Sequence, residues 1–181
     1  MNLMFISDIH WIKTNLKKIK ERYKELNCNK LIVLGDLYYI GPRNQMKDGY
    51  DIQYIKEFLE SFKDDLICLR GNCDSEVDLM VSDFPIINEL SLINIDFHDI
   101  YLTHGHIYNK NNWPKENSIL IYGHLHIPFI KEEKKNLFIN PGSISLPKEN
   151  NNPTYLIYSN NKFTIYDIND NIIAEKIINK K

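Results

Sequence analysis

The stretch KLIVLGD, residues 30–36, is a continuous run of leucine and β-branched residues that ends in glycine and aspartate. Such a run is typical of a parallel strand that is buried on both faces. The segments LMFISD at residues 3–8 and DLICLRGN at residues 65–72 repeat this pattern of an apolar run followed by polar or turn-forming residues. Three such strands separated by helices predict right-handed βαβ crossovers and a parallel sheet.

Both connections between these strands carry a helical pattern. One helix is predicted from Thr14 onward and a second over residues 51–62, because apolar residues recur at steps of three and four. The loop LYYIGPRNQMKDGY, residues 37–50, contains the turn signals Gly-Pro and Asp-Gly. The apolar positions are Leu16, Ile19, Tyr23 and Leu26 in the first helix and Ile52, Ile55, Leu59 and Phe62 in the second.

The pattern of predicted elements changes after a short helical stretch, SEVDLM at residues 75–80. Closely spaced strand patterns follow, separated by Asn-rich turns, which favours antiparallel or mixed pairing. The predicted fold class is therefore α/β, with two packed sheets in a single domain over residues 1–181. The later strands are predicted at residues 88–95, 99–105, 118–123, 136–140, 154–159 and 162–168.

Composition excludes several classes of protein. The chain has 181 residues, 43% hydrophobic and 25% charged, which is ordinary for a globular domain. Its net charge of −2 provides no electrostatic attraction for nucleic acid or an anionic membrane, so neither partner is expected. The start lacks the pattern of a secretory signal, and no apolar run is long enough to span a membrane.

The cysteines favour a reducing, cytoplasmic setting. There are three, Cys28, Cys68 and Cys73, and no two of them form a C-x-x-C pair. An odd number without such spacing is not typical of a disulfide framework.

Residues able to bind metal follow five of the strand-like segments. Ligands in α/β proteins bind at the carboxyl ends of strands, so side chains in these positions can converge. Two histidines of the segment GHLH stand one residue apart, which calls for an explanation in a chain with six histidines. The residues are Asp8 and His10; Asp36; Asn72, Cys73 and Asp74; His104 and His106; and His124 and His126.

Each of these residues also has an ordinary structural interpretation. An aspartate after a strand is commonly a turn residue or a helix N-cap, as Asp8 and Asp36 would be. Gly71-Asn72 is a common turn signal. His124 and His126 could be half-exposed neighbours on one face of a strand. The metal hypothesis depends on the coincidence of all five segments.

The residue types indicate the metal chemistry. Carboxylate, imidazole and amide ligands without thiolate favour Mn, Fe or Zn in mixed nitrogen and oxygen sites. Seven of these side chains acting as ligands would exceed what one tetrahedral ion takes but would suit two ions that share a carboxylate. Two ions about 3.5–4 Å apart can hold a bridging hydroxide and clamp a phosphoryl group.

The order of the motifs resembles the calcineurin-like metallophosphoesterase superfamily, and within it the YfcE-type group of small bacterial and archaeal phosphodiesterases. The similar stretches span residues 7–147. The resemblance implies a four-layer αββα sandwich and a dinuclear centre that often holds manganese, with Fe, Zn, Ni and Mg as alternatives. The matching stretches are SDIH, LGD, GPRN, RGNCDSEVD, LTHGH, YGHLHIP and NPGSIS.

The resemblance also implies how the ligands are divided. Asp36 would bridge the two ions. The remaining ligands would be Asp8, His10 and His126 for the first ion and Asn72, His104 and His124 for the second.

Cys73 departs from relatives that carry histidine after the asparagine, although YfcE-like members share this cysteine. A thiol is a weak donor, so it protonates a leaving group poorly. The alternative is that Cys73 is a small buried hydrophobe beside the site.

Four other residues have expected positions. Arg43 is a candidate substrate contact, since a lysine-rich chain keeps arginine where its planar fork is useful, and a structural clamp is an equal alternative. His106 is a candidate substrate contact or a neighbour of the ligands. Asn140 is expected to shape a turn beside the site, and His98 is expected at the surface.

The predicted function is hydrolysis of a small phosphodiester by in-line attack of metal-bound hydroxide, with Asn72 and Cys73 as catalytic residues. One alternative is a catalytically weak metal-binding scaffold for protein interactions, and another is a phosphomonoesterase or nucleotidase. Whether the chain forms a homo-oligomer stays open.

Overall fold

The structure, a computed structural model, describes residues 1–39, 49–87 and 89–179. Its first sheet combines the early and the late strands of the chain. In the described part of the chain the sheet has the order β12-β11-β10-β1-β2-β3-β4. These strands are β1 (Asn2–Ile6), β2 (Lys30–Val33), β3 (Leu66–Leu69), β4 (Ile86–Ile87), β10 (Thr154–Ser159), β11 (Lys162–Asp167) and β12 (Ile172–Ile177).

The second sheet has the order β5-β6-β7-β9-β8. As predicted, β1, β2 and β3 pair in parallel, while the later strands give antiparallel and mixed pairing. The strands of the second sheet are β5 (Leu90–Ile95), β6 (His98–Thr103), β7 (Ile119–Tyr122), β8 (Pro128–Glu133) and β9 (Asn136–Pro141).

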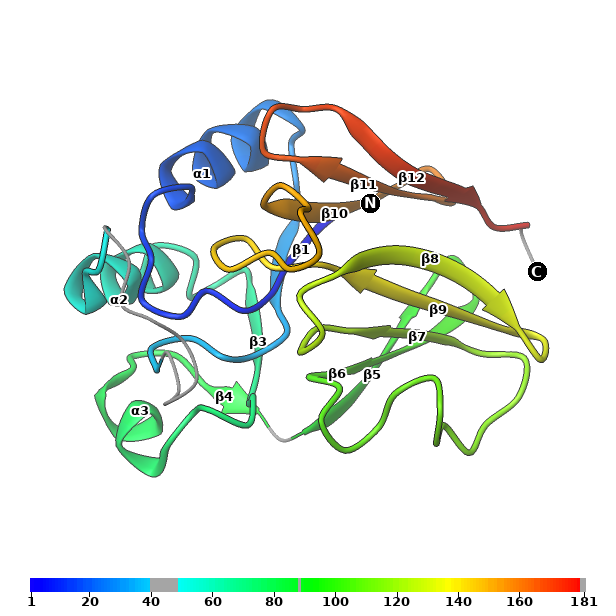
Figure 1. Cartoon of the computed structure of the whole chain (residues 1–181), viewed down its shortest axis with the longest axis horizontal. Helices are drawn as coiled ribbons and strands as arrows, with labels where there is room; N and C mark the ends of the chain where they lie inside the picture. The colour runs from blue at the N-terminus through cyan, green and yellow to red at the C-terminus, as the bar shows by residue number, and fades with distance from the viewer. Residues whose placement is uncertain (40–48, 88, 180–181) are drawn as a thin grey trace.

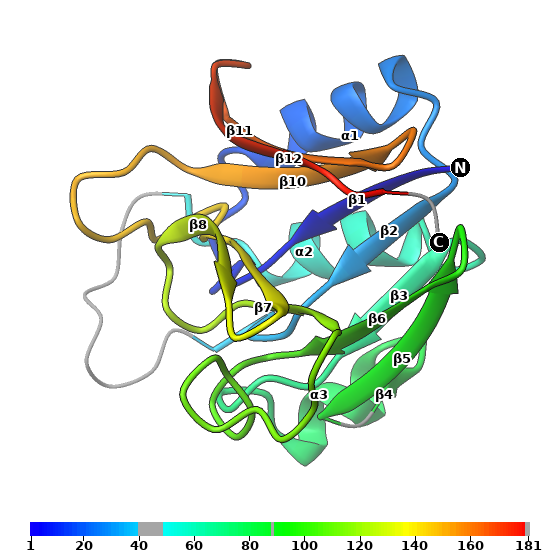
Figure 2. The same ribbon diagram turned by 90° about the vertical axis from the view of Figure 1, so that its right-hand side faces the viewer.

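Helices α1 (Leu16–Glu25) and α2 (Ile52–Glu60) cover one face of the first sheet, and the second sheet packs against the other (Figures 1 and 2). Strand β1 shows why both faces of the first sheet are covered. Alternate residues of a strand point to opposite faces, so Met4 packs among the residues under the helices, whereas Phe5 packs between the sheets. The predicted fold class of two mixed sheets with helices is confirmed. The third helix, α3 (Glu76–Val81), begins with a capping box formed by Ser75 and Asp78.

The outer face of the second sheet is covered by the segment of residues 104–118, which forms no helix in the described chain. Tyr122 and Phe138 of this face pack with Trp113 of the segment. The ring of Trp113 lies 4.9 Å from that of Tyr101, and its indole N–H donates to Ser118 Oγ at 2.9 Å. A loop anchored by an aromatic residue therefore forms the outer layer on this side.

Strands β4, β8 and β12 were not predicted, and the two helices proved shorter than expected. Strand β8 lies at the edge of the second sheet, begins at Pro128 and ends in Lys131-Glu132-Glu133, all of which weaken a strand pattern. None of the described helices has the length and apolar character needed to cross a membrane.

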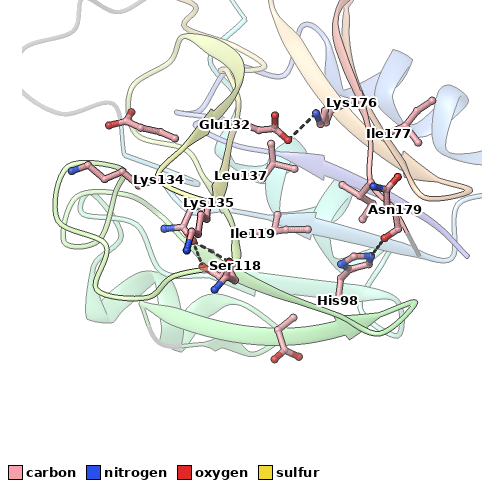
Figure 3. Close-up of a pocket in the computed structure, with 15 residues that line it drawn as sticks. His98, Ser118, Ile119, Glu132, Lys134, Lys135, Leu137, Lys176, Ile177 and Asn179 are labelled. Carbon is pink, nitrogen blue, oxygen red and sulfur yellow. Dashed lines mark hydrogen bonds and ion pairs between the residues drawn. The ribbon is translucent and has the colours of Figure 1, made fainter. Parts of the chain in front are cut away.

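A cavity of about 620 Å³ lies at the amino ends of β6, β7 and β9 (Figure 3). His98 lines it, and the expectation that this histidine lies at the surface was wrong. It is 7% exposed, and its Nε2 lies 2.7 Å from the carbonyl oxygen of Asn179, close enough to hold the end of the chain against β6. The Lys176–Glu132 ion pair, at 2.7 Å, links the two sheets beside it.

Candidate metal centre

The carboxyl ends of β1, β2, β3, β6 and β7 come together, as predicted from the sequence. The side chains that follow these strands meet in one cluster. Asp8, His10 and Asp36 are each less than 3% exposed, and His104 is fully buried. The cluster therefore lies below the surface, at the end of the sandwich opposite the cavity lined by His98.

Asp8, His10 and His126 form the first group of potential ligands. Their candidate ligand atoms all lie within 4.8 Å of one another. Asp8 Oδ1 is 3.2 Å from His126 Nε2 and 3.8 Å from His10 Nε2, and the two Nε2 atoms are 3.4 Å apart. The three side chains therefore point at one location.

Asp36 lies between two histidines. Its Oδ2 is 3.5 Å from His10 Nε2 and 3.4 Å from His104 Nε2. Asp36, Asp8 and His104 form a second group whose ligand atoms lie within 4.8 Å. One carboxylate oxygen thus faces a histidine from each of the two predicted ion sites.

Backbone carbonyls hold three of the histidine rings. In each ring Nδ1 lies 2.7 Å from a carbonyl oxygen, which accepts its proton and leaves Nε2 directed at the carboxylates. Metal-binding histidines are commonly oriented in this way. The pairs are His10 with Tyr39, His104 with Leu34, and His126 with Leu146.

The remaining predicted ligands lie near His104. Asn72 Oδ1 is 3.0 Å from His104 Nε2. The ring of His124 lies 5.1 Å from that of His104, outside the two tight groups. The ring of His106 is 5.5 Å from that of His104, and Arg43 falls outside the described residues.

Several of these residues adopt an unusual backbone conformation. Positive φ is uncommon for residues other than glycine, and it clusters at functional sites where the surrounding structure enforces it. The turns after β1, β2 and β7 use this conformation to direct their side chains into the cluster. The residues are Asp8, His10, Asp36, His124 and His126, with φ between 46° and 66°.

Asp74, grouped in the sequence with the metal-competent residues, has a different role. Its carboxylate accepts hydrogen bonds from the backbone N–H groups of Asp36, Leu37 and Gly71, at 2.7–2.9 Å. Asp74 therefore joins the turn after β2 to the turn after β3. The two turns carry Asp36 and Asn72, so this bonding sets their spacing.

The NPGS segment, residues 140–143, forms hydrogen bonds with the turns that carry the candidate ligands. Asn140 Nδ2 donates to the carbonyl oxygen of Gly123, and Asn140 Oδ1 accepts from Gly142 N–H, so the predicted turn role is confirmed. Ser143, which was not predicted as a site residue, donates to the carbonyl oxygen of Asp8 and accepts from Leu146 N–H, both at 2.8 Å. Ser143 thus links Asp8 to the residue that holds His126, and only its place in the NPGS motif hinted at this.

The described side chains supply only part of the positive charge that the cluster needs. Asp8 and Asp36 are buried carboxylates, and among the described residues only histidines pair with them. Asp8 Oδ1 is buried without a hydrogen-bond partner. Because uncompensated buried carboxylates are unfavourable, these residues fit divalent cations well.

The charges perturb the pKa values of the cluster. Burial opposes ionisation of Asp8, but the close approach of His126 and the other nearby imidazoles outweigh this effect and hold its pKa below the usual range. Burial also opposes the charged form of His104, yet Asp36 and Asp8 raise its pKa to about 9. Without a metal, a proton on His104 therefore partly neutralises the carboxylates.

Metal binding is expected to release this proton. A ligating imidazole must be neutral, and His104 is protonated below a pKa of about 9, so affinity should rise by about tenfold per pH unit from neutrality toward that value. Calorimetric titration with Mn²⁺ in buffers of different ionisation enthalpy measures the protons released. His98→Gln, at the far end of the sandwich, serves as a control. Binding without proton release would contradict the expectation.

Comparison with known proteins finds similar sequences over most of the chain. A model of the calcineurin-like phosphoesterase superfamily domain matches residues 1–162. Phosphodiesterase YfcE of Escherichia coli K12 is 36% identical over 182 residues, covering 99% of both chains. The probable metallophosphoesterase YsnB of Bacillus subtilis is 27% identical over 166 residues, covering 87% of this chain and 83% of the relative.

Solved structures extend the comparison. The structure of YfcE, a phosphoesterase from E. coli, matches with a TM-score of 0.95 at 35% identity, covering 99% of this chain and 100% of that one. Zn²⁺-bound Vps29 of Entamoeba histolytica matches with a TM-score of 0.59 at 20% identity, covering 97% and 96% of the chains. At that identity the likeness extends to the fold alone.

Proposed function

The chain belongs to the calcineurin-like phosphoesterase superfamily and is a metal-dependent phosphoesterase, and we propose more specifically that it is a dinuclear phosphodiesterase acting on a small phosphodiester. The observation that carries this proposal is the position of Asp36 Oδ2, within 3.5 Å of both His10 and His104. An oxygen shared in this way suits a carboxylate that bridges two ions.

The proposed ligand set follows from that bridge. Asp8, His10 and His126 would hold one ion, and Asn72, His104 and His124 the other, with manganese as the first candidate metal and Fe, Zn, Ni and Mg as alternatives. When bound, the pair would activate water for in-line attack and neutralise the phosphoryl oxygens. Asn72 is exposed, so its amide can also orient the phosphate.

His106 is the proposed substrate contact among the described residues. Burial lowers its pKa, so its ring is neutral near physiological pH. The ring is partly exposed and stands 6.2 Å from that of His124. A neutral imidazole there can donate its N–H to a phosphoryl or ester oxygen. Arg43 stays a prediction from sequence.

The assay that tests the proposal compares substrates. Metal-free protein is loaded with Mn²⁺ and given an aryl phosphodiester, the matching monoester, or the diester with a chelator. Preference for the diester and loss with chelator support the proposal. Preference for the monoester favours a phosphomonoesterase or nucleotidase. Metal binding without turnover of either ester favours the interaction scaffold, and both outcomes contradict the phosphodiesterase proposal.

Replacing Cys73 with histidine is expected to raise turnover of diesters with poor leaving groups. Burial and the charge of Asp36 raise the pKa of the Cys73 thiol to about 12, which makes it a weak acid, whereas an imidazolium can protonate an alkoxide. The gain should reach about tenfold to a hundredfold for alkyl diesters and be smaller for nitrophenyl diesters. A fall for both substrates would contradict this role, and Cys28→Ser is the matched control.

We also propose that residues 1–181 act as one domain in the cytoplasm. Ligands from both sheets share the centre, which supports a single catalytic unit. The free thiols of Cys28, Cys68 and Cys73 are typical of a reducing compartment.

A further inference from the structure

The cluster contains a third group of potential ligands that includes a sulfur atom. Atoms of His10, Asp36 and Cys73 lie within 4.8 Å of one another. The proposed manganese ligands do not include this thiol. Among the described residues, neither Cys28 nor Cys68 belongs to such a group.

The backbone and a neighbouring amide hold the Cys73 side chain at this position. Cys73 N–H donates to Asp36 Oδ1 at 2.9 Å, which leaves Asp36 Oδ2 facing the histidines. Asn72 Nδ2 donates to Cys73 Sγ at 3.3 Å. The sulfur therefore stands beside the carboxylate that the two ion sites share, and it is only partly buried.

We propose that Cys73 Sγ is a further ligand, together with His10 and Asp36, for a thiophilic divalent cation such as Zn²⁺. Thiolate is a soft ligand that selects ions of this kind, whereas Mn²⁺ prefers oxygen and nitrogen. As the sulfur–metal bond forms, the S–H bond breaks and the proton passes to solvent, without any change in oxidation state. The centre then has two binding modes, and the softness of the ion selects between them.

This inference rests on the proposed function only because His10 and Asp36 are also ligands in the proposed manganese centre. A cation held by Cys73 would sit on the side where the leaving group of a diester is expected. Zn²⁺ bound in this mode is therefore expected to oppose turnover supported by Mn²⁺.

The test uses Cd²⁺ as a spectroscopic substitute for Zn²⁺. Full-length protein is stripped with a chelator and titrated with Cd²⁺ alone, while sulfur-to-cadmium charge-transfer absorption is followed in the ultraviolet. The band is expected in the unmodified protein and in Cys28→Ser and is expected to be absent in Cys73→Ser. Affinity for Cd²⁺ should fall by about tenfold or more in Cys73→Ser, as for the loss of other groups that support a metal site.

A second measurement requires no substitution at Cys73. Alkylation of the unmodified protein is followed by mass spectrometry, and Cd²⁺ is expected to slow modification of Cys73 but not of Cys28, while Mn²⁺ protects neither. Cadmium binding without the band, a band that persists in Cys73→Ser, or equal alkylation with and without Cd²⁺ would overturn the inference. Manganese-dependent hydrolysis by the same preparation is measured separately, and its absence would overturn the proposed function instead.

Discussion

Asp36→Asn is expected to lower kcat/KM for a phosphodiester by about 10³-fold, since loss of a bridging ligand removes several kcal/mol of stabilisation. Asparagine has nearly the same shape and can still accept the hydrogen bond from Cys73 N–H. It replaces one carboxylate oxygen with an amide nitrogen, however, so it cannot present two oxygens. The substitution therefore removes the negative charge and the bridging oxygen while it leaves the packing of the side chain nearly unchanged.

Steady-state kinetics and metal analysis of the purified variant measure this effect together. Metal content is expected to fall along with activity, because Asp36 Oδ2 faces both His10 and His104. Asp64→Asn provides a matched control, because Asp64 is exposed and precedes β3, whereas the candidate ligand Asn72 follows the carboxyl end of that strand. Nearly unchanged activity and metal content in Asp36→Asn would show that this carboxylate does not bridge.

Gly35→Ala is expected to destabilise the protein by about 3 kcal/mol and to lower its melting temperature by about 10 °C. Gly35 has φ +97°, a conformation that strains residues with a Cβ atom. An added Cβ would also lie 2.5 Å from Gly71 N and 2.9 Å from His104 Nδ1. Backbone atoms of the turn after β3 cannot move aside without displacing Asp74 and its hydrogen bonds.

Gly49→Ala separates the strain of a positive φ from the steric clash of the added Cβ atom. Gly49 has nearly the same φ, +94°, but its added Cβ would meet Thr14 Oγ1, a hydroxyl that can rotate away. Thermal unfolding of the metal-free variants, followed by circular dichroism, should therefore place Gly35→Ala well below Gly49→Ala. Equal melting temperatures would mean that conformational strain alone accounts for both effects.

Local patterns in the sequence were sufficient to predict the helices and the strands that carry the candidate ligands. Strands β1, β2 and β3 are apolar runs whose ends are marked by the polar residues that follow, so the pattern identified both the strand and its candidate ligand. The edge strands β8 and β12 were not predicted from the sequence. Edge strands face solvent and carry charged residues, such as Lys131 and Glu175, that obscure the strand pattern.

The roles of polar residues within the site were harder to predict. Asp74 and Asp36 are both aspartates that follow strands, yet one binds backbone N–H groups and the other faces histidines. The difference depends on which atoms lie within 3 to 4 Å, and those atoms come from distant parts of the chain. His98 was misplaced for the same reason, since its partner is the carbonyl oxygen of Asn179.

The kinds of donor atoms and their attachment to strand ends could be read from residue order, because hydrophobic runs and metal-ligand chemistry are properties of short segments. Folding alone established that one oxygen of Asp36 lies between His10 and His104, that backbone carbonyls orient three imidazoles, and that the Cys73 sulfur joins the cluster. These features depend on contacts between residues far apart in the chain. The contacts of His10 and Cys73 with Asp36 form when β1, β2 and β3 pair, and the contact of His104 with Asp36 forms only when the two sheets pack together.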